Sequence, residues 1–300
     1  MSARRYAIRH RTSYEYEGDV VHAHQLLHLV PRPCERQTVL RHAIEVSPAP
    51  ASRSEEQDAF GNPVTRLEFD RPHRRLEVVS ELDVEVRSAG APADGGEAWE
   101  SVREALAYRT GTLDDERVEA FRNRLQSPYV RLKTAFADYA EDCFTPGRPL
   151  LEASRALMTK IHGEFTYAPG ETSVATPLVE VLEHRRGVCQ DFAHVMIACL
   201  RSLGLAARYV SGYLRTTRKE EDSALVGADA SHAWVAVYSP TLGWVDLDPT
   251  NGVAVDGDHV TIAWGRDFGD VSPLRGVLFG GGRHTVSVSV TTTSEPPPAS

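Results

Sequence analysis

The residue of this sequence with the clearest chemical potential is Cys189, because its neighbours predict that it opens a helix. After it, apolar residues recur at the spacing of one helical face: Phe192, Val195, Met196, Cys199, Leu200 and Leu203. Unpaired backbone N–H groups and the positive end of the helix dipole favour an anion in the first turn, so the thiolate form is favoured there. The local sequence leaves two interpretations open, an activated nucleophile and a small apolar packing residue.

A catalytic thiol needs a base for its proton and a third group that holds the base, and the downstream sequence offers both. His232 opens a strand pattern over 232–238, and Asp248 ends the next strand pattern. In an antiparallel hairpin turning at 239–243, the start of the first strand lies beside the end of the second, so imidazole and carboxylate can meet. Asp246 has the same parity and is the alternative orienting acid, although it lies nearer the turn.

Four further residues are candidates for lining a cleft or supporting an oxyanion: Tyr167, Gln190, Trp234 and Trp244. The backbone N–H of Cys189 is the natural oxyanion donor, and a side chain such as that of Tyr167 would complete the hole. The two tryptophans are equally consistent with an aromatic core. We expect neither a cofactor nor a metal site, because Cys189, His194 and Cys199 on one helix would close a tetrahedral site poorly.

The pattern of the whole chain predicts an α+β fold in two parts. Alternating strands with frequent turns indicate an antiparallel β-sandwich-like module over residues 1–88, and 89–97 has the composition of a linker. Helical periodicity then forms a preface to a core in which the cysteine-bearing helix packs on an antiparallel sheet bearing His232 and Asp248. We assign this core, with a last strand near 285–290, to residues 98–293, and 294–300 to a disordered tail.

Composition narrows the classes of partner and compartment. With 41% hydrophobic and 25% charged residues the chain has globular composition, and its net charge of -9 argues against nucleic acid and against an anionic membrane surface. There is no apolar run of about 18 residues, and the first residues contain no apolar signal-peptide segment. Four cysteines make neither a disulfide framework nor a C-x-x-C pair. We therefore expect a soluble, cytoplasmic protein.

Several motifs give the sequence a specific resemblance to the bacterial transglutaminase-like superfamily, which has a papain-like fold. In order, these motifs are Gly187-Val-Cys-Gln-Asp-Phe-Ala-His194, Leu203-Gly-Leu-Ala-Ala-Arg-Tyr-Val-Ser-Gly-Tyr213, Ser231-His-Ala-Trp234, Gly243-Trp and Asp248-Pro-Thr250. The first part of the chain resembles the β module that precedes this domain, at His10-x-Thr-x-Tyr14, Pro31-Arg32 and Asp58-x-Phe-Gly-Asn62. The resemblance implies that Cys189 is the nucleophile, His232 the general base and acid, and Asp248 the orienting residue.

These observations predict a thiol-dependent acyl-transfer enzyme that attacks the amide bonds of a peptide or protein. We favour a peptidase or amidase, because the bacterial members that the sequence resembles are commonly regarded as thiol proteases and no calcium-loop spacing is present. A charged loop over 215–230 also predicts an open, hydrated cleft. The alternatives are a protein-glutamine transamidase and a non-catalytic peptide-binding module with a relic site.

Overall fold

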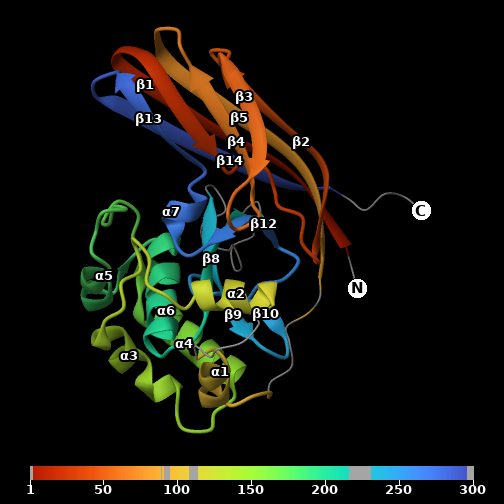
Figure 1. Cartoon of the computed structure of the whole chain (residues 1–300), viewed down its shortest axis with the longest axis vertical. Helices are drawn as coiled ribbons and strands as arrows, with labels where there is room; N and C mark the ends of the chain where they lie inside the picture. Colours follow the sequence, from red (N-terminus) through yellow and green to blue (C-terminus); the bar gives the residue numbers. More distant parts are fainter. Residues whose placement is uncertain (1–2, 89, 91–94, 108–113, 216–230, 296–300) are drawn as a thin grey trace, which may run out of the picture.

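The computed structural model of this 300-residue chain describes residues 3–88, 90, 95–107, 114–215 and 231–295. A long curled sheet forms one end of the molecule and a unit of helices around a second sheet forms the other (Figure 1). This mixed architecture confirms the predicted α+β class. No helix within those ranges is long and apolar enough to cross a bilayer.

The curled sheet is antiparallel and is organised around its first strand. The strand order is β2–β5–β1–β4–β3, and β13 and β14 also pair with β1. The bounds are β1 (Ala3–Leu27), β2 (Gln37–Ser47), β3 (Ser52–Gln57), β4 (Pro63–Phe69), β5 (His73–Arg87), β13 (Leu274–Gly280) and β14 (His284–Glu295). The predicted N-terminal β module thus takes the form of one curled sheet.

The face that β1 turns to the core changes along the strand. Even-numbered residues such as Tyr6, Ile8 and Val20 are buried in its first part, and odd-numbered Ala23 and Leu27 are buried afterwards. The register against β13 shifts between residues 20 and 22, as a β-bulge requires, and this shift exchanges the two faces. Side chains at positions 22 and 24 therefore point to the outer face.

The end of the chain completes the sheet in which the chain begins. The predicted last strand, near 285–290, is present as the longer β14, which pairs with β1 from Arg5 to Tyr16. Ser294 and Glu295, expected in a disordered tail, belong to this strand, because pairing with β1 supplies backbone partners that the sequence does not reveal. Residues 296–300 lie outside the described part of the chain.

The second unit is built on a five-stranded antiparallel sheet of order β11–β10–β9–β8–β12. Its strands are β8 (Ala207–Leu214), β9 (His232–Ser239), β10 (Gly243–Asp248), β11 (Val253–Ala254) and β12 (His259–Gly265). A two-stranded parallel sheet joins β6 (Thr166–Tyr167) to β7 (Arg186–Gly187). The sequence indicated β9 and β10, whereas β11, β12 and β13 were not predicted.

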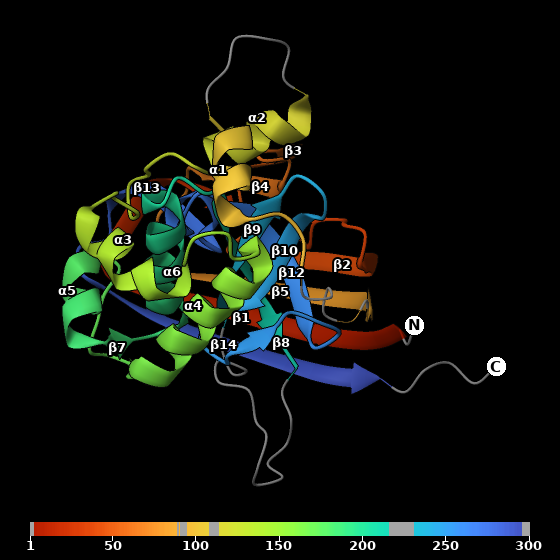
Figure 2. The same cartoon turned by 90° about the horizontal axis from the view of Figure 1, so that it is seen from below.

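Helices surround this second sheet, and the predicted cysteine-bearing helix is the most buried of them. The helices are α1 (Trp99–Ala105), α2 (Asp115–Arg122), α3 (Thr134–Ala140), η1 (Glu141–Cys143), α4 (Leu150–Glu164), α5 (Leu178–His184), α6 (Cys189–Ser202) and α7 (Phe268–Val271). Every residue of α6 from Asp191 to Arg201 is buried, and the helix packs against β8 and β9 (Figure 2). The all-round apolar pattern of this segment therefore reflects its central position.

The two units meet through side chains of the N-terminal motifs. The side-chain amide of Asn62 donates to the backbone carbonyl of Trp264 at 2.8 Å, and the backbone N–H of Trp264 donates to the side-chain oxygen of Asn62 at 3.0 Å. The Arg32 guanidinium lies 3.4 Å from the centre of the Trp264 ring. Because Trp264 belongs to β12, these contacts attach the curled sheet to the edge of the second sheet.

Two buried histidines should make the fold sensitive to acid. Burial lowers the pKa of His10 to about 4 and that of His194 to about 3. In the unfolded chain the pKa of an imidazole is about 6.5. Between these values the unfolded chain binds more protons, so stability falls as pH falls through 6.5. At pH 4.5 we expect each of the two histidines to lower the free energy of unfolding by about 2–3 kcal/mol relative to pH 7.

Urea unfolding at both pH values checks this, with His10→Gln as the test variant. His10 is held by the Tyr213 hydroxyl at 2.6 Å and the Thr12 hydroxyl at 3.0 Å, which are contacts that a glutamine can partly replace. The variant should lose less stability on acidification than the parent, while His42→Gln, at an exposed position of β2, should behave like the parent. Equal acid sensitivity of all three proteins would contradict the assignment.

Candidate active site

Cys189 is the first residue of α6, and the turn before it is held by a buried carboxylate. Asp191 Oδ2 accepts from the Val188 N–H at 2.8 Å and from the Thr172 hydroxyl at 2.7 Å. A Cβ on Gly187 would lie 2.5 Å from that same oxygen, so only glycine allows this approach. Asp191 therefore caps the helix, and the half-buried Cys189 thiol lies where the first-turn N–H groups have no intrahelical partners.

His232 and Asp248 meet as the hairpin register predicts. They lie at the start of β9 and the end of β10, and His232 Nε2 lies 2.8 Å from Asp248 Oδ2. Both side chains are fully buried. The rival acid Asp246 is engaged elsewhere, since it accepts from the Trp234 indole N–H at 3.2 Å and from the Arg36 guanidinium at 2.7 Å. Asp248 is thus the acid that the structure brings to His232.

The Asp248 carboxylate is the centre of a hydrogen-bond network. Its Oδ2 also contacts Asn251 Nδ2 at 2.7 Å and His259 Nε2 at 3.2 Å, and its Oδ1 accepts from the backbone N–H groups of Thr250 and Asn251. Burial by itself would raise the pKa of Asp248, but the charge and hydrogen bond of His232 and the bond from His259 hold it well below its usual range. This carboxylate stays ionised.

The charge on Asp248 acts in turn on His232. Burial by itself would lower the pKa of this imidazole, but the neighbouring carboxylate raises it above its ordinary value, and Cys189 adds to the rise. His232 is therefore favoured in its protonated form, with Nε2 committed to Asp248 and Nδ1 left as the nitrogen available to a thiol.

Cys189 and His232 are close without a completed hydrogen bond. The thiol sulfur lies 4.0 Å from the carbonyl oxygen of Ser231, the residue before His232, and Cys189 influences the pKa of His232. Within the described ranges, however, Nδ1 of His232 has no partner at hydrogen-bond distance. The thiol and the imidazole therefore form no hydrogen bond in the resting site. Such contacts are often long in a site without substrate and shorten when one binds.

Two of the four supporting candidates lie near Cys189. Tyr167 lies on β6, opposite Gly187 of β7, and the pKa of its hydroxyl is raised by burial and by the neighbouring Cys189. Gln190 is the second residue of α6 and is half-buried. These positions are compatible with the cleft and oxyanion roles expected for both residues.

The two tryptophans have different positions. Trp234 is fully buried, and its ring lies edge-on to the imidazole of His259 with 5.3 Å between centroids. Trp244 lies at the opposite end of β10, packed against Tyr238 and against the Arg208 guanidinium. Trp244 lies four positions before Asp248 along the strand, a length of about 13 Å. Trp234 therefore packs beside the candidate site, and Trp244 packs at the other end of the sheet.

Sequence reasoning missed His259 and Asn251, which both contact Asp248. Asn251 follows the Asp248-Pro-Thr motif directly, and this proximity was a usable signal. His259 opens β12, a strand that was not predicted, so no pattern placed it near the hairpin. Gly212 leaves room for the Trp234 ring that packs on His259, because a Cβ at position 212 would lie 2.3 Å from that ring.

Alkylation rates should separate Cys189 from the other thiols. Burial raises the pKa of Cys34, that of Cys143 to about 11, and that of Cys199 well above its usual range. We expect iodoacetamide at neutral pH to modify Cys189 first, since the thiolate is the reacting form. Peptide mapping of the native protein over time measures this order. Modification of Cys189 as the slowest of the four would contradict its role as nucleophile.

Comparison with known families finds two matches that together cover both units. Residues 6–85 match the bacterial transglutaminase-like N-terminal region, and residues 137–249 match the transglutaminase-like superfamily. The second match includes Cys189, His232 and Asp248.

One bacterial relative is similar over most of the chain, and another is similar over about a third of it. An uncharacterized protein of Mycobacterium tuberculosis is 39% identical over 290 residues, which cover 94% of this chain and 90% of the relative. A protein-glutamine gamma-glutamyltransferase of Pseudomonas aeruginosa is 36% identical over 96 residues, 31% of this chain and 14% of that protein. Among solved structures, a candidate cysteine protease from Cytophaga hutchinsonii matches with a TM-score of 0.75 at 20% identity, covering 100% of this chain and 93% of that chain, which shows the shared fold.

Proposed function

Since this chain belongs to the transglutaminase-like superfamily, we propose that it is a thiol-dependent enzyme that attacks amide bonds and hydrolyses them. The observation that supports this most directly is the buried hydrogen bond between His232 and Asp248 beside the helix start that carries Cys189. The proposed substrate is a peptide or protein amide.

In the acylation step, the Cys189 thiolate attacks the amide carbonyl and forms a C–S bond. The oxyanion that develops would be stabilised by the backbone N–H of Cys189, with Tyr167 or Gln190 as the side-chain donor. His232 then gives its Nδ1 proton to the amide nitrogen, the C–N bond breaks, and the amine leaves. Asp248 keeps the imidazole oriented and stabilises its positive charge throughout.

In the second step, water replaces the amine. Neutral His232 takes a proton from the water, the resulting hydroxide attacks the thioester, and the C–S bond breaks to release a carboxylic acid and the thiolate. An amine acceptor would follow the same path and give a new amide. The two activities therefore share the acyl-enzyme and differ only in what reaches it.

Transamidation is the second candidate, because a named gamma-glutamyltransferase is similar to this chain over 96 residues. Hydrolysis is preferred because a transamidase must exclude water from the thioester, which calls for an enclosed apolar entrance. Trp244, one of the two tryptophans considered for such walls, lies at the other end of β10. The charged loop expected over 215–230 lies outside the described residues, apart from Arg215.

One assay separates hydrolysis from transamidation. The protein is incubated with glutamine-containing peptides and a millimolar fluorescent primary amine, and mass spectrometry measures cleaved or deamidated product against amine-linked product, with Cys189→Ala as the control. We expect mainly hydrolysis. Predominant amine incorporation would identify a transamidase, and binding of peptides without any Cys189-dependent product would favour the non-catalytic module.

A further inference from the structure

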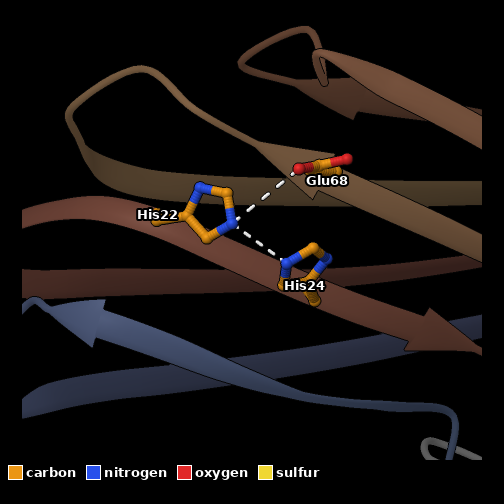
Figure 3. Close-up of side chains that lie close together, drawn as sticks. All are labelled: His22, His24 and Glu68. Carbon is orange, nitrogen blue, oxygen red and sulfur yellow. Dashed lines mark hydrogen bonds and ion pairs between the residues drawn. The ribbon is translucent and has the colours of Figure 1, made fainter.

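Two histidines and a glutamate come together on the outer face of the curled sheet, away from the residues discussed above (Figure 3). His22 and His24 alternate along β1, and Glu68 lies on β4 directly opposite His24 in the strand register. The register shift in β1 turns positions 22 and 24 outward, and the side chains of His22 and Glu68 remain 37% and 40% exposed. Solvent and small ions can therefore reach all three.

The donor atoms of these three side chains all lie within 4.8 Å of one another. The two Nε2 atoms lie 2.9 Å apart, and Nε2 of His22 lies 3.8 Å from Glu68 Oε1. With metal–ligand bonds of about 2.0–2.1 Å, these separations correspond to ligand–metal–ligand angles of roughly 90° and 135°. Three protein ligands leave at least one position of a four-coordinate ion open to water.

The contact between the facing imidazoles depends on which nitrogen of each ring carries a proton. A hydrogen bond between two Nε2 atoms requires one ring to carry the proton there and the other to lack it, and a second proton would leave two donors facing each other. A metal ion accepts a lone pair from both rings at once. Two imidazoles and a carboxylate suit Zn²⁺ and neighbouring transition ions, whereas Mg²⁺ and Ca²⁺ prefer all-oxygen sites.

A further contact orients the carboxylate. The Ser52 hydroxyl, on β3, donates to Glu68 Oε2 at 3.1 Å and leaves Oε1 directed at His22. Partners of this kind fix the orientation of metal ligands in many proteins. The ligands also sit on paired strands, so little backbone entropy is lost when an ion binds.

We propose that His22, His24 and Glu68 form a binding site for a divalent transition ion of the Zn²⁺ class, which links β1 to β4. This site belongs to the curled sheet and is separate from the network of His232, Asp248 and His259, whose donor atoms also lie close together. Its expected consequence is a more stable sheet when the ion is bound, because a ligand that binds only the folded state raises its stability.

The experiment measures Zn²⁺ binding to the untagged full chain after removal of metals by a chelator. A Cys189→Ser background avoids metal binding by the thiol of the candidate active site, and isothermal titration gives affinity and stoichiometry. His24→Ala and Glu68→Gln are the test variants because both positions are partly exposed and neither holds the core. His42→Ala is the matched control, since His42 is an exposed histidine of the same sheet outside the cluster.

We expect the parent and His42→Ala to bind one more equivalent of Zn²⁺ than His24→Ala, or to bind the same equivalent about tenfold more tightly. Zn²⁺ should also raise the Tm of the parent and of His42→Ala, but not that of His24→Ala. Glu68→Gln should lower the affinity for this same equivalent of Zn²⁺. Equal affinity and stoichiometry in the parent and His24→Ala would overturn the site. If His24→Ala loses Zn²⁺ binding but Glu68→Gln binds Zn²⁺ as tightly as the parent, the three-ligand assignment would be overturned.

Discussion

Cys189→Ala and His232→Ala should each lower turnover of an amide substrate by a factor on the order of 10³ or more. The first removes the atom that forms the acyl-enzyme, and the second removes the group that protonates the leaving amine and later deprotonates water. Both effects are measured by steady-state kinetics with a peptide that the assay for hydrolysis and transamidation identifies as a substrate. Circular dichroism and thermal unfolding establish that the variants remain folded.

The double variant distinguishes a catalytic unit from two independent contributions. If thiol and imidazole act together, the Cys189→Ala/His232→Ala protein should be no slower than either single variant, because each substitution already removes the whole pathway. Losses that multiply would contradict that unit. Cys199→Ala provides a matched control for the thiol, since Cys199 is a fully buried residue of the same helix; it should keep turnover if the protein folds.

Asp248→Asn should cause the second large loss, on the order of 10²–10⁴ in turnover, while leaving a measurable residual rate. The carboxylate accepts hydrogen bonds from His232, His259 and Asn251 at one oxygen and two backbone N–H groups at the other. An amide presents one oxygen and one NH₂ group, so either the imidazole or the backbone turn faces a donor in place of an acceptor. The imidazole would then lose both its orientation and its neighbouring charge.

The same variant should change the pH profile in a defined direction. Asp248 raises the pKa of His232, so its loss should move the alkaline limit of activity to lower pH. The raised pKa of His232 stabilises the fold fully below the ordinary imidazole pKa, and this contribution is lost only as pH rises through the raised value. The lowered pKa of Asp248 stabilises the fold above the ordinary carboxyl pKa, and this contribution is lost as pH falls through the lowered value. Both contributions are present near neutral pH, so the variant should also unfold more easily there.

Asp246→Asn is the control for this prediction, because Asp246 is on the same strand and face but contacts Trp234 and Arg36 instead of His232. It should keep most of the turnover and an unchanged alkaline limit. Comparable kinetic losses in the two variants would mean that general disturbance of β10, and not the loss of an orienting carboxylate, explains the effect of Asp248→Asn.

The parts of the candidate site that depend on local periodicity can be predicted from the sequence alone. The apolar spacing after Cys189 predicts α6 and puts the thiol in its first turn, since helical period and dipole act over a few residues. The alternation around a short turn predicts the β9–β10 hairpin. Its register then follows from the turn, so the meeting of His232 with Asp248 required no distant information.

The residues that complete these helical and hairpin segments come from distant parts of the chain, and they were identified only in the folded structure. His259 reaches Asp248 from β12, a strand without a recognised pattern, and Trp244 shares β10 with Asp248 yet lies at its far end. The pairing of β14 with β1, and the approach of Glu68 to His22 and His24, join positions far apart in the chain. Such contacts depend on sheet order and on a bulge that exchanges the faces of a strand, and periodicity within one segment carries no information about either.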